Sequence, residues 1–138
     1  MSANSQAPLI AVINNSAEVV EMLGLILEQA DYQHVAESVV NFRRGERPVD
    51  AFLERHNPHV LIWDIAFPYQ ENWAFFCQIR DSGVLRQRGV VLTTTNKQAL
   101  ELFIGPHAAR ELIGKPYDIE DILQAVHQAL SQAGTCRH

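Results

Sequence analysis

The sequence is poor in cysteine, contains no long apolar run and has no excess of basic residues. Cys77 and Cys136 are its only cysteines. One lies in a helical pattern and the other near the C-terminus, so we expect no disulfide framework and a cytoplasmic location. No apolar run approaches the ~20 residues that a membrane span needs, and residues 1–8 lack the apolar core of a secretory signal. The formal net charge of −5 argues against nucleic-acid binding through a basic face.

Two common ligand-binding patterns are also absent. The sequence contains neither G-x-G-x-x-G nor G-x-x-x-x-G-K, so no glycine-rich phosphate-binding loop is expected. Its six histidines are scattered without the spacing of metal ligands. The densest basic cluster, Arg43, Arg44 and Arg47, is interpreted as a solvated loop. What remains is an ordinary globular composition, 47% apolar and 20% charged, over 138 residues, the length of a single domain.

Strand patterns and helix patterns alternate five times along the chain. We expect strands over residues 9–13, 33–40, 59–64, 89–95 and 110–114. We expect helices over residues 17–30, 49–56, 73–81, 97–104 and 118–130, with loops over 41–47 and 69–72. Ser16 and Asp118 are the expected N-caps of the first and last helix. This alternation predicts an α/β fold, in which a doubly wound parallel sheet of five strands has helices on both faces.

Asp64 is the residue around which we expect the function to be organised. It interrupts the mainly apolar stretch from His59 to Pro68, which is typical of a strand buried on both faces. The aspartate falls at or near the carboxyl end of that strand, and ligands of open α/β sheets bind at this edge. A carboxylate at such a place is costly unless a partner neutralises it or a reaction uses it.

A hydroxyl run and a lysine follow at the carboxyl ends of the next two strands. These are Thr93-Thr94-Thr95 and Lys115, the latter directly before Pro116. In a doubly wound sheet they would face the same crevice as Asp64. A carboxylate can attack phosphorus to form an acyl phosphate, while a hydroxyl and an ammonium hold the phosphoryl oxygens. The sequence therefore favours phosphoryl chemistry at this edge, although strand-forming threonines and a surface lysine are the plainer interpretation of each motif alone.

The chain resembles the receiver domains of bacterial two-component response regulators. The matching features are Asp64 with Pro68 four residues later, Leu92-Thr93 on the fourth strand, and Lys115-Pro116, where Lys115 comes 22 positions after Thr93. The resemblance covers residues 9–130 and implies a flavodoxin-like (βα)5 fold with strand order 2-1-3-4-5. Residues 1–8 would then be a flexible leader and 131–138 a flexible tail. The resemblance implies that Asp64 is the phosphoacceptor, Thr93 the switch hydroxyl, with Thr94 as the fallback, and Lys115 the phosphoryl-binding lysine.

The chain departs from the receiver pattern where that family binds its metal. The family places two acidic residues after the first strand to hold Mg²⁺ beside the phosphoacceptor, and Asn14-Asn15 stand there. Amides supply oxygens without charge, so a metal site of Asp64, Asn14 and Asn15 would be degenerate, and Mg²⁺ binding is expected to be weak or absent. Asparagines at this place can also be simple turn residues.

Two further departures concern the expected response to phosphorylation. Leu112 stands three residues before the lysine, where the family usually has an aromatic ring that rotates inward. The segment Tyr69-Gln70-Glu71-Asn72 replaces the family's glycine-rich turn, while small Ala66 leaves room at the mouth of the pocket.

Three functions remain open from the sequence. The first is a phosphorelay receiver that accepts a phosphoryl group from a histidine kinase or phosphotransfer protein and signals to a downstream effector, with no enzymatic activity beyond slow self-phosphorylation or dephosphorylation. The second is a receiver-fold interaction or homodimerisation module that works without phosphorylation, which Asn14-Asn15 and Leu112 favour. The third is a small flavin-binding flavodoxin-like protein.

No output domain follows residue 138, so a partner protein would read the signal or the chain is a fragment of a longer one. The sequence does not identify the kinase, the partner or the stimulus.

Overall fold

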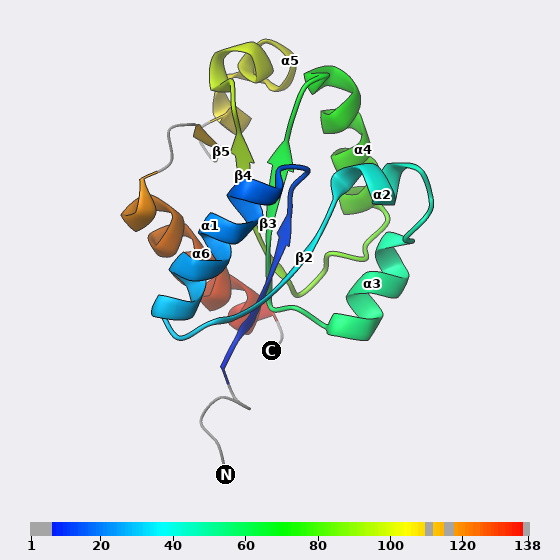
Figure 1. Ribbon diagram of the computed structural model, residues 1–138. Coiled ribbons are helices and arrows are strands. Elements are labelled where there is room, and N and C mark those ends of the chain that lie inside the picture. The colour runs from blue at the N-terminus through cyan, green and yellow to red at the C-terminus, as the bar shows by residue number, and fades with distance from the viewer. Residues whose placement is uncertain (1–6, 110–111, 115–117, 137–138) are drawn as a thin grey trace.

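The sheet of this protein contains five parallel strands in the order β2-β1-β3-β4-β5 (Figure 1). The computed structural model describes residues 7–109, 112–114 and 118–136. The strands are β1 (Leu9–Ile13), β2 (Gln33–Glu37), β3 (Val60–Ile65), β4 (Gly89–Thr94) and β5 (Leu112–Gly114). The parallel sheet and the flavodoxin-like strand order are therefore confirmed.

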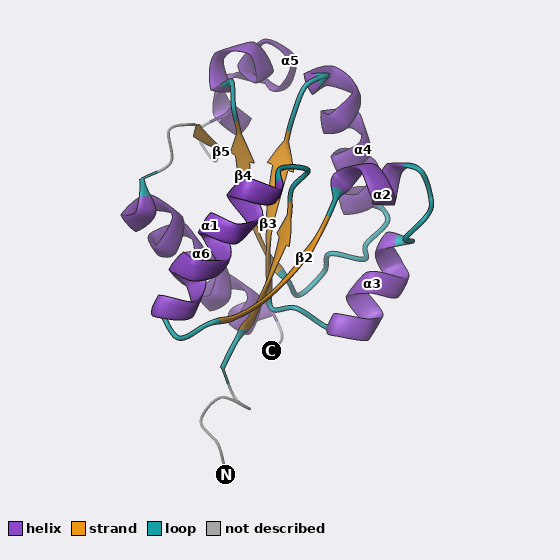
Figure 2. Cartoon of the chain, in the orientation of Figure 1, coloured by secondary structure: helices purple, strands orange, loops and turns teal. Residues whose placement is uncertain are grey.

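Helices cover both faces of this sheet, as Figure 2 shows. One face packs against α1 (Ala17–Gln29) and α6 (Ile119–Cys136), and the other against α2 (Val39–Arg43), α3 (Val49–His56), α4 (Tyr69–Asp81) and α5 (Lys97–Ala109). None of the helices in the described part of the chain is both long and apolar enough to cross a membrane.

Strand β3 lies in the middle of the sheet, and all of its residues are buried. Its side chains alternate between the two cores, because successive side chains of a strand point to opposite faces. Val60 and Ile62 join the core under α1 and α6. Trp63 joins the opposite core and stacks on Phe42 of α2, with ring centroids 5.8 Å apart. By the same alternation, Asp64 lies on the α1 and α6 face.

The main difference from the sequence prediction lies directly after β2. We predicted a strand to Val40 and a loop over 41–47, but β2 ends at Glu37 and the short helix α2 follows. Ser38 caps this helix, and its Oγ accepts a hydrogen bond from Val40 N at 3.1 Å. Val39 and Phe42, three residues apart, are both buried on its inner side. The predicted strand was wrong here because helical spacing buries these two side chains together.

Smaller differences occur in the later helices. The loop predicted over 69–72 is wrong, because α4 begins at Tyr69, directly after Pro68. The helix predicted over 97–104 is interrupted directly after that range, at Gly105 with φ 85°, although helical backbone resumes after it. Helix α6 runs to Cys136, beyond the predicted end at Leu130. Its cap is as predicted, since Asp118 Oδ1 accepts from Glu120 N at 2.9 Å.

Close packing of β4 on α6 requires glycine at the start of that strand. A Cβ atom placed on Gly89 would lie 2.6 Å from the carbonyl oxygen of Ala129. No side chain fits at that distance, so Gly89 lets the strand approach the helix. This contact fixes β4, and with it the threonines at its carboxyl end, against the α1 and α6 layer.

Candidate functional site

Asp64 and Thr93 meet at the carboxyl edge of the sheet. They are register partners on the neighbouring strands β3 and β4, and therefore point to the same face. Thr93 Oγ1 donates a hydrogen bond to Asp64 Oδ1 at 2.7 Å. Only 6% of Asp64 and 1% of Thr93 is exposed. The bond gives the buried carboxyl oxygen a hydrogen-bond partner inside the protein.

Thr94, the alternative hydroxyl, does not reach the carboxylate. It points to the opposite face of the sheet, where its Oγ1 donates to the backbone oxygen of Ile65 at 2.8 Å. Thr94 is fully buried, so this bond satisfies a hydroxyl that no water contacts. The structure thus places Thr93, and not Thr94, beside Asp64.

Lys115 and Pro116 lie outside the described residues. Strand β5 ends one residue earlier, at Gly114, which is the register partner of Thr94. Leu112 is described: it pairs with Leu92 and is 3% exposed, in the core with Leu100. The leucine that stands at the family's aromatic position is therefore a packing residue in this structure.

Asn14, at the end of β1, supports the turn into α1. It is buried, and its Oδ1 accepts a hydrogen bond from the backbone of Ser16 at 2.8 Å. This is the local Asx-type bond that asparagine forms at turns. Ser16 in turn accepts from Val19 N and caps α1. The side-chain oxygen of Asn14 is therefore engaged in shaping the start of the helix.

Asn15 joins the end of β1 to α2. Its Oδ1 accepts from Ser38 Oγ at 2.8 Å and from Val40 N at 3.0 Å. The Val40 amide is one of the helix N-terminal donors that have no partner inside the helix. The side chain of Asn15 thus acts as a second cap of α2, supplied from 25 residues away in the sequence.

The residues expected to form a metal site fit Mg²⁺ poorly. A hard dication prefers anionic oxygen ligands, and of Asp64, Asn14 and Asn15 only the first is acidic. Each asparagine oxygen already accepts backbone hydrogen bonds. Within the described residues, no group of three or more His, Cys, Asp or Glu side chains is arranged to hold a metal ion.

The sequence analysis missed a polar chain that holds the loop after β3. Asn72 on α4 is 5% exposed; its Nδ2 donates to the Ala66 carbonyl at 2.8 Å, and its Oδ1 accepts from Arg43 Nη1 at 2.9 Å. Arg43 belongs to the cluster interpreted as a solvated loop, and Asn72 to the segment predicted as a loop. The loop predicted over 69–72 was wrong, whereas Arg43, Arg44 and Arg47 are all exposed as expected and only Arg43 lies in a helix. The four-residue spacing of Asn72 and Phe76 was the signal that could have placed the amide on a buried helix face.

Aromatic side chains stand at the rim beside this loop. The exposed ring of Phe67 packs edge-on against Tyr69, with centroids 5.9 Å apart. Tyr69 Oη lies 3.1 Å from Thr95 Oγ1, within hydrogen-bond distance. This contact connects the segment after β3 to the segment after β4, so the two loops that follow Asp64 and Thr93 are joined.

Cys77 on α4 is a weak candidate for a nucleophile. Burial raises the pKa of its thiol, while the nearby Arg80 acts in the opposite direction. A raised pKa leaves less of the reactive thiolate at neutral pH.

Solved structures of receiver domains share this fold. No protein-family model matches the sequence. The chain is similar to a sensor protein from Polaromonas sp. JS666, with a TM-score of 0.69 at 17% identity over 91% of this chain and 98% of that chain. It is also similar to a response regulator from Thermotoga maritima, with a TM-score of 0.68 at 19% identity over 91% and 98%. The chemotaxis response regulator CheY4 of Vibrio cholerae gives a TM-score of 0.66 at 17% identity over 90% and 99%.

These similarities extend over nearly the whole of each chain, and they confirm the expected receiver-type, CheY-like fold. At such low identity they establish the fold alone. The roles of individual residues rest on the geometry of this chain.

Proposed function

We propose that this protein is a receiver-domain protein of a two-component phosphorelay, with Asp64 at the phosphoacceptor position and Mg²⁺-dependent phosphorylation weak or absent. One observation supports both halves of the proposal. Asp64 keeps a buried hydroxyl partner in Thr93, whereas Asn14 and Asn15 use their oxygens to hold backbone.

The chemistry open to Asp64 is transfer of a phosphoryl group from a phosphodonor. A carboxylate oxygen of Asp64 would form the bond to phosphorus while the bond between phosphorus and the donor breaks, which leaves an acyl phosphate. The Thr93 hydroxyl and the ammonium of Lys115 would hold the transferred oxygens. Phosphoryl transfer depends on positioning and charge neutralisation, so a site with few charged groups should be slow. The protein is therefore proposed to catalyse at most slow phosphorylation and dephosphorylation of itself.

A second candidate is a receiver-fold module that binds partners, or a second copy of itself, without phosphorylation. The anchoring of Asn15 to α2 and the burial of Leu112 favour it, because both residues serve packing in place of the metal and aromatic roles. In the first case the partners would be a histidine kinase or phosphotransfer protein and an effector, and in the second an effector or a second copy of the chain. We place either activity in the cytoplasm.

The test is phosphorylation by acetyl phosphate and Mg²⁺, followed by mass spectrometry of the intact protein. We expect little or no phosphoryl addition to the unchanged protein. The double variant Asn14→Asp with Asn15→Asp should bind Mg²⁺ at least about tenfold more tightly, since each carboxylate adds attraction to a dication a few ångströms away. It should also gain a phosphoryl group, and the added change Asp64→Asn should abolish that gain.

Three results would contradict this proposal. Rapid Mg²⁺-dependent labelling of the unchanged protein at Asp64 would show an ordinary receiver. Labelling that survives Asp64→Asn would show that the acceptor lies elsewhere. If the double variant binds Mg²⁺ no better, the asparagines do not border the site.

A further inference from the structure

Helices α2, α3 and α4 lie next to one another on the sheet face away from α1 and α6 (Figure 1). Where they meet, the surface contains a groove with a volume of about 300 Å³, at the lower end of the range for small-molecule sites. Its apolar lining residues are Phe42, Val49, Phe75, Ile79 and Val84. None of the described residues of the candidate site lines it, so any function of the groove is separate.

Two aromatic rings form walls of this groove. Phe42 on α2 stacks on Trp63, with ring centroids 5.8 Å apart, and the centroid of the half-buried Phe75 on α4 lies 6.2 Å from that of Trp63. Trp63 itself is fully buried, and its indole N–H has no hydrogen-bond partner among the described residues. The groove is thus a place where the aromatic cluster around Trp63 meets the surface. Aromatic rings pack favourably against a further ring, either offset or edge to face.

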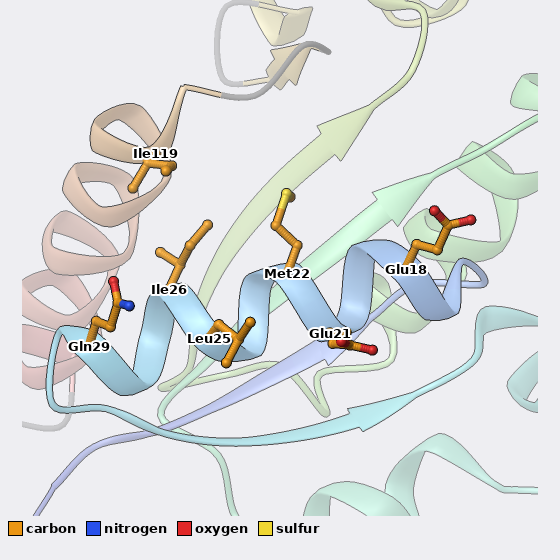
Figure 3. Close-up of a pocket in the computed structure, with 7 residues that line it drawn as sticks. All are labelled: Glu18, Glu21, Met22, Leu25, Ile26, Gln29 and Ile119. Atoms are coloured by element: carbon orange, nitrogen blue, oxygen red, sulfur yellow. The ribbon is translucent and has the colours of Figure 1, made fainter.

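The hollow on the outer side of α1 is larger, with a volume of about 470 Å³, but its lining differs. Figure 3 shows Met22 and Leu25 projecting from α1, with Ile119 on α6 across from them. Among the described residues that line this hollow, none is aromatic. Aliphatic side chains give apolar contact without a ring face. The aromatic walls therefore favour the groove beside α4 for a flat ligand, and the hollow beside α1 serves as the comparison.

Charge decides which aromatic ligand the groove favours. Asp50, at the start of α3, is the one charged side chain among the described residues that line it. It is exposed, and its Oδ1 accepts a hydrogen bond from Ala51 N at 2.9 Å. A carboxylate attracts a cation, and so does the face of an aromatic ring. An ammonium group on the ligand is therefore favoured, whereas a carboxylate on the ligand would meet Asp50 with no lysine, arginine or histidine among the described lining residues.

We propose that the groove between α2, α3 and α4 binds a small aromatic amine, with its ring against Phe42 and Phe75 and its ammonium beside Asp50. Ser82 is the remaining polar residue of the lining, and its Oγ donates to the backbone oxygen of Ile79 at 2.6 Å. The inference goes beyond the proposed phosphorelay function. It involves no residue of the phosphoacceptor site, so the two proposals can fail or succeed independently.

The experiment is an NMR titration of the ¹⁵N-labelled full chain with 2-phenylethylamine. The matched probe is 3-phenylpropionate, which has the same ring and a similar length but the opposite charge at neutral pH. We expect saturable shifts with the amine at the backbone amides of Val49, Ile79 and Val84 and at the indole N–H of Trp63, which the walls of the groove flank. Binding of 3-phenylpropionate should be at least about fivefold weaker, since it exchanges an attraction to Asp50 for a repulsion.

Variants test the placement. Asp50→Asn keeps an acceptor for the backbone but removes the charge, and should weaken amine binding about threefold. Its matched control is Glu71→Gln, at an exposed position of α4 outside the groove. Phe75→Leu removes one ring and should weaken binding of both probes about fivefold. Leu25→Ser, in the hollow beside α1, is its control, and this variant and Asp64→Asn should leave both affinities unchanged.

Four outcomes would overturn the inference. Equal binding of the two probes would show that the groove does not select an amine. An equal loss with Phe75→Leu and Leu25→Ser would show binding to apolar surface in general. Shifts confined to the residues around Met22 would place the site in the hollow beside α1. The lack of any saturable shift up to about 10 mM amine would show that the groove holds no such ligand.

Discussion

The end of β1 and the ends of β3 and β4 lie at the same edge of one sheet, yet they use polar side chains differently. At β3 and β4, Asp64 and Thr93 bond to each other, side chain to side chain. At β1, the oxygens of Asn14 and Asn15 accept hydrogen bonds from the backbone of neighbouring turns and helices. The first arrangement holds a buried carboxylate against a buried hydroxyl, and the second ties secondary structure together.

This difference shows how amides can hold the backbone at one place on a sheet edge while a carboxylate pairs with a hydroxyl at another. An asparagine oxygen accepts hydrogen bonds at the same positions as a carboxylate oxygen, so the backbone contacts are kept when the charge is absent. The charge itself matters only to a cation or to the reaction. We therefore expect the free energy of unfolding and the rate of any phosphorylation to respond differently to substitutions at the end of β1 and at the ends of β3 and β4.

The largest effect on stability is expected at Asn72, which holds the end of β3 from α4. Asn72→Ala removes the bonds to Arg43 and to the Ala66 carbonyl, and should lower the free energy of unfolding by about 2 to 3 kcal/mol. Urea denaturation would measure this. Gln78→Ala, at an exposed position of the same helix, is the control and should change it by less than about 0.5 kcal/mol. Equal effects of the two changes would mean that the polar chain does not support the site.

An intermediate effect is expected at Thr93. Thr93→Val keeps the shape of the side chain but removes the donor to Asp64 Oδ1, so unfolding should become easier by about 1 to 2 kcal/mol. Thr93→Ser keeps the hydroxyl and should retain the hydrogen bond. Because the bond is between side chains of the site, the valine variant should also slow any phosphorylation that the Asn14→Asp and Asn15→Asp changes restore. Unimpaired phosphorylation of the valine variant would show that the hydroxyl has no part in the chemistry.

The smallest effect is expected at Asn15, and it separates the two uses of polar groups most sharply. Asn15→Ala removes the acceptor for Ser38 and Val40, and should cost about 1 kcal/mol in urea denaturation, the usual cost of a lost helix cap. Asn15→Asp keeps an acceptor there and should stay within about 0.5 kcal/mol of the unchanged protein. If aspartate destabilises as much as alanine, the position requires an amide and not merely an oxygen.

The pattern of apolar residues was sufficient to predict most of the fold. The buried strand around Asp64, the helix capped by Ser16 and the five alternating units are local patterns, and the structure contains each of them. The prediction failed at Val39–Phe42 and at Tyr69–Asn72, where a few residues form helical turns. Short segments hold too few periods for the spacing to distinguish helix from strand or loop.

Only part of the candidate site could be predicted, because local patterns do not specify contacts between distant segments. The pairing of Asp64 with Thr93 follows from strand order and register, which the resemblance to receiver domains implied. The engagement of Asn15 with α2, and of Asn72 with Arg43 and Ala66, could not be predicted. These bonds join segments 25, 29 and 6 residues apart through side-chain orientations that no local pattern specifies.

The sequence by itself determined the alternation of strands and helices, the chemical identity of the residues at the strand ends, and the lack of acidic residues after β1. These are properties of single segments, set by hydrophobic spacing and by residue type. Only the tertiary structure decided which hydroxyl meets Asp64, which backbone groups Asn14 and Asn15 bind, and that Asn72 joins Arg43 to the loop after β3. Such features depend on register and on the packing of distant segments, because a hydrogen bond or a groove exists only when both of its sides are brought together.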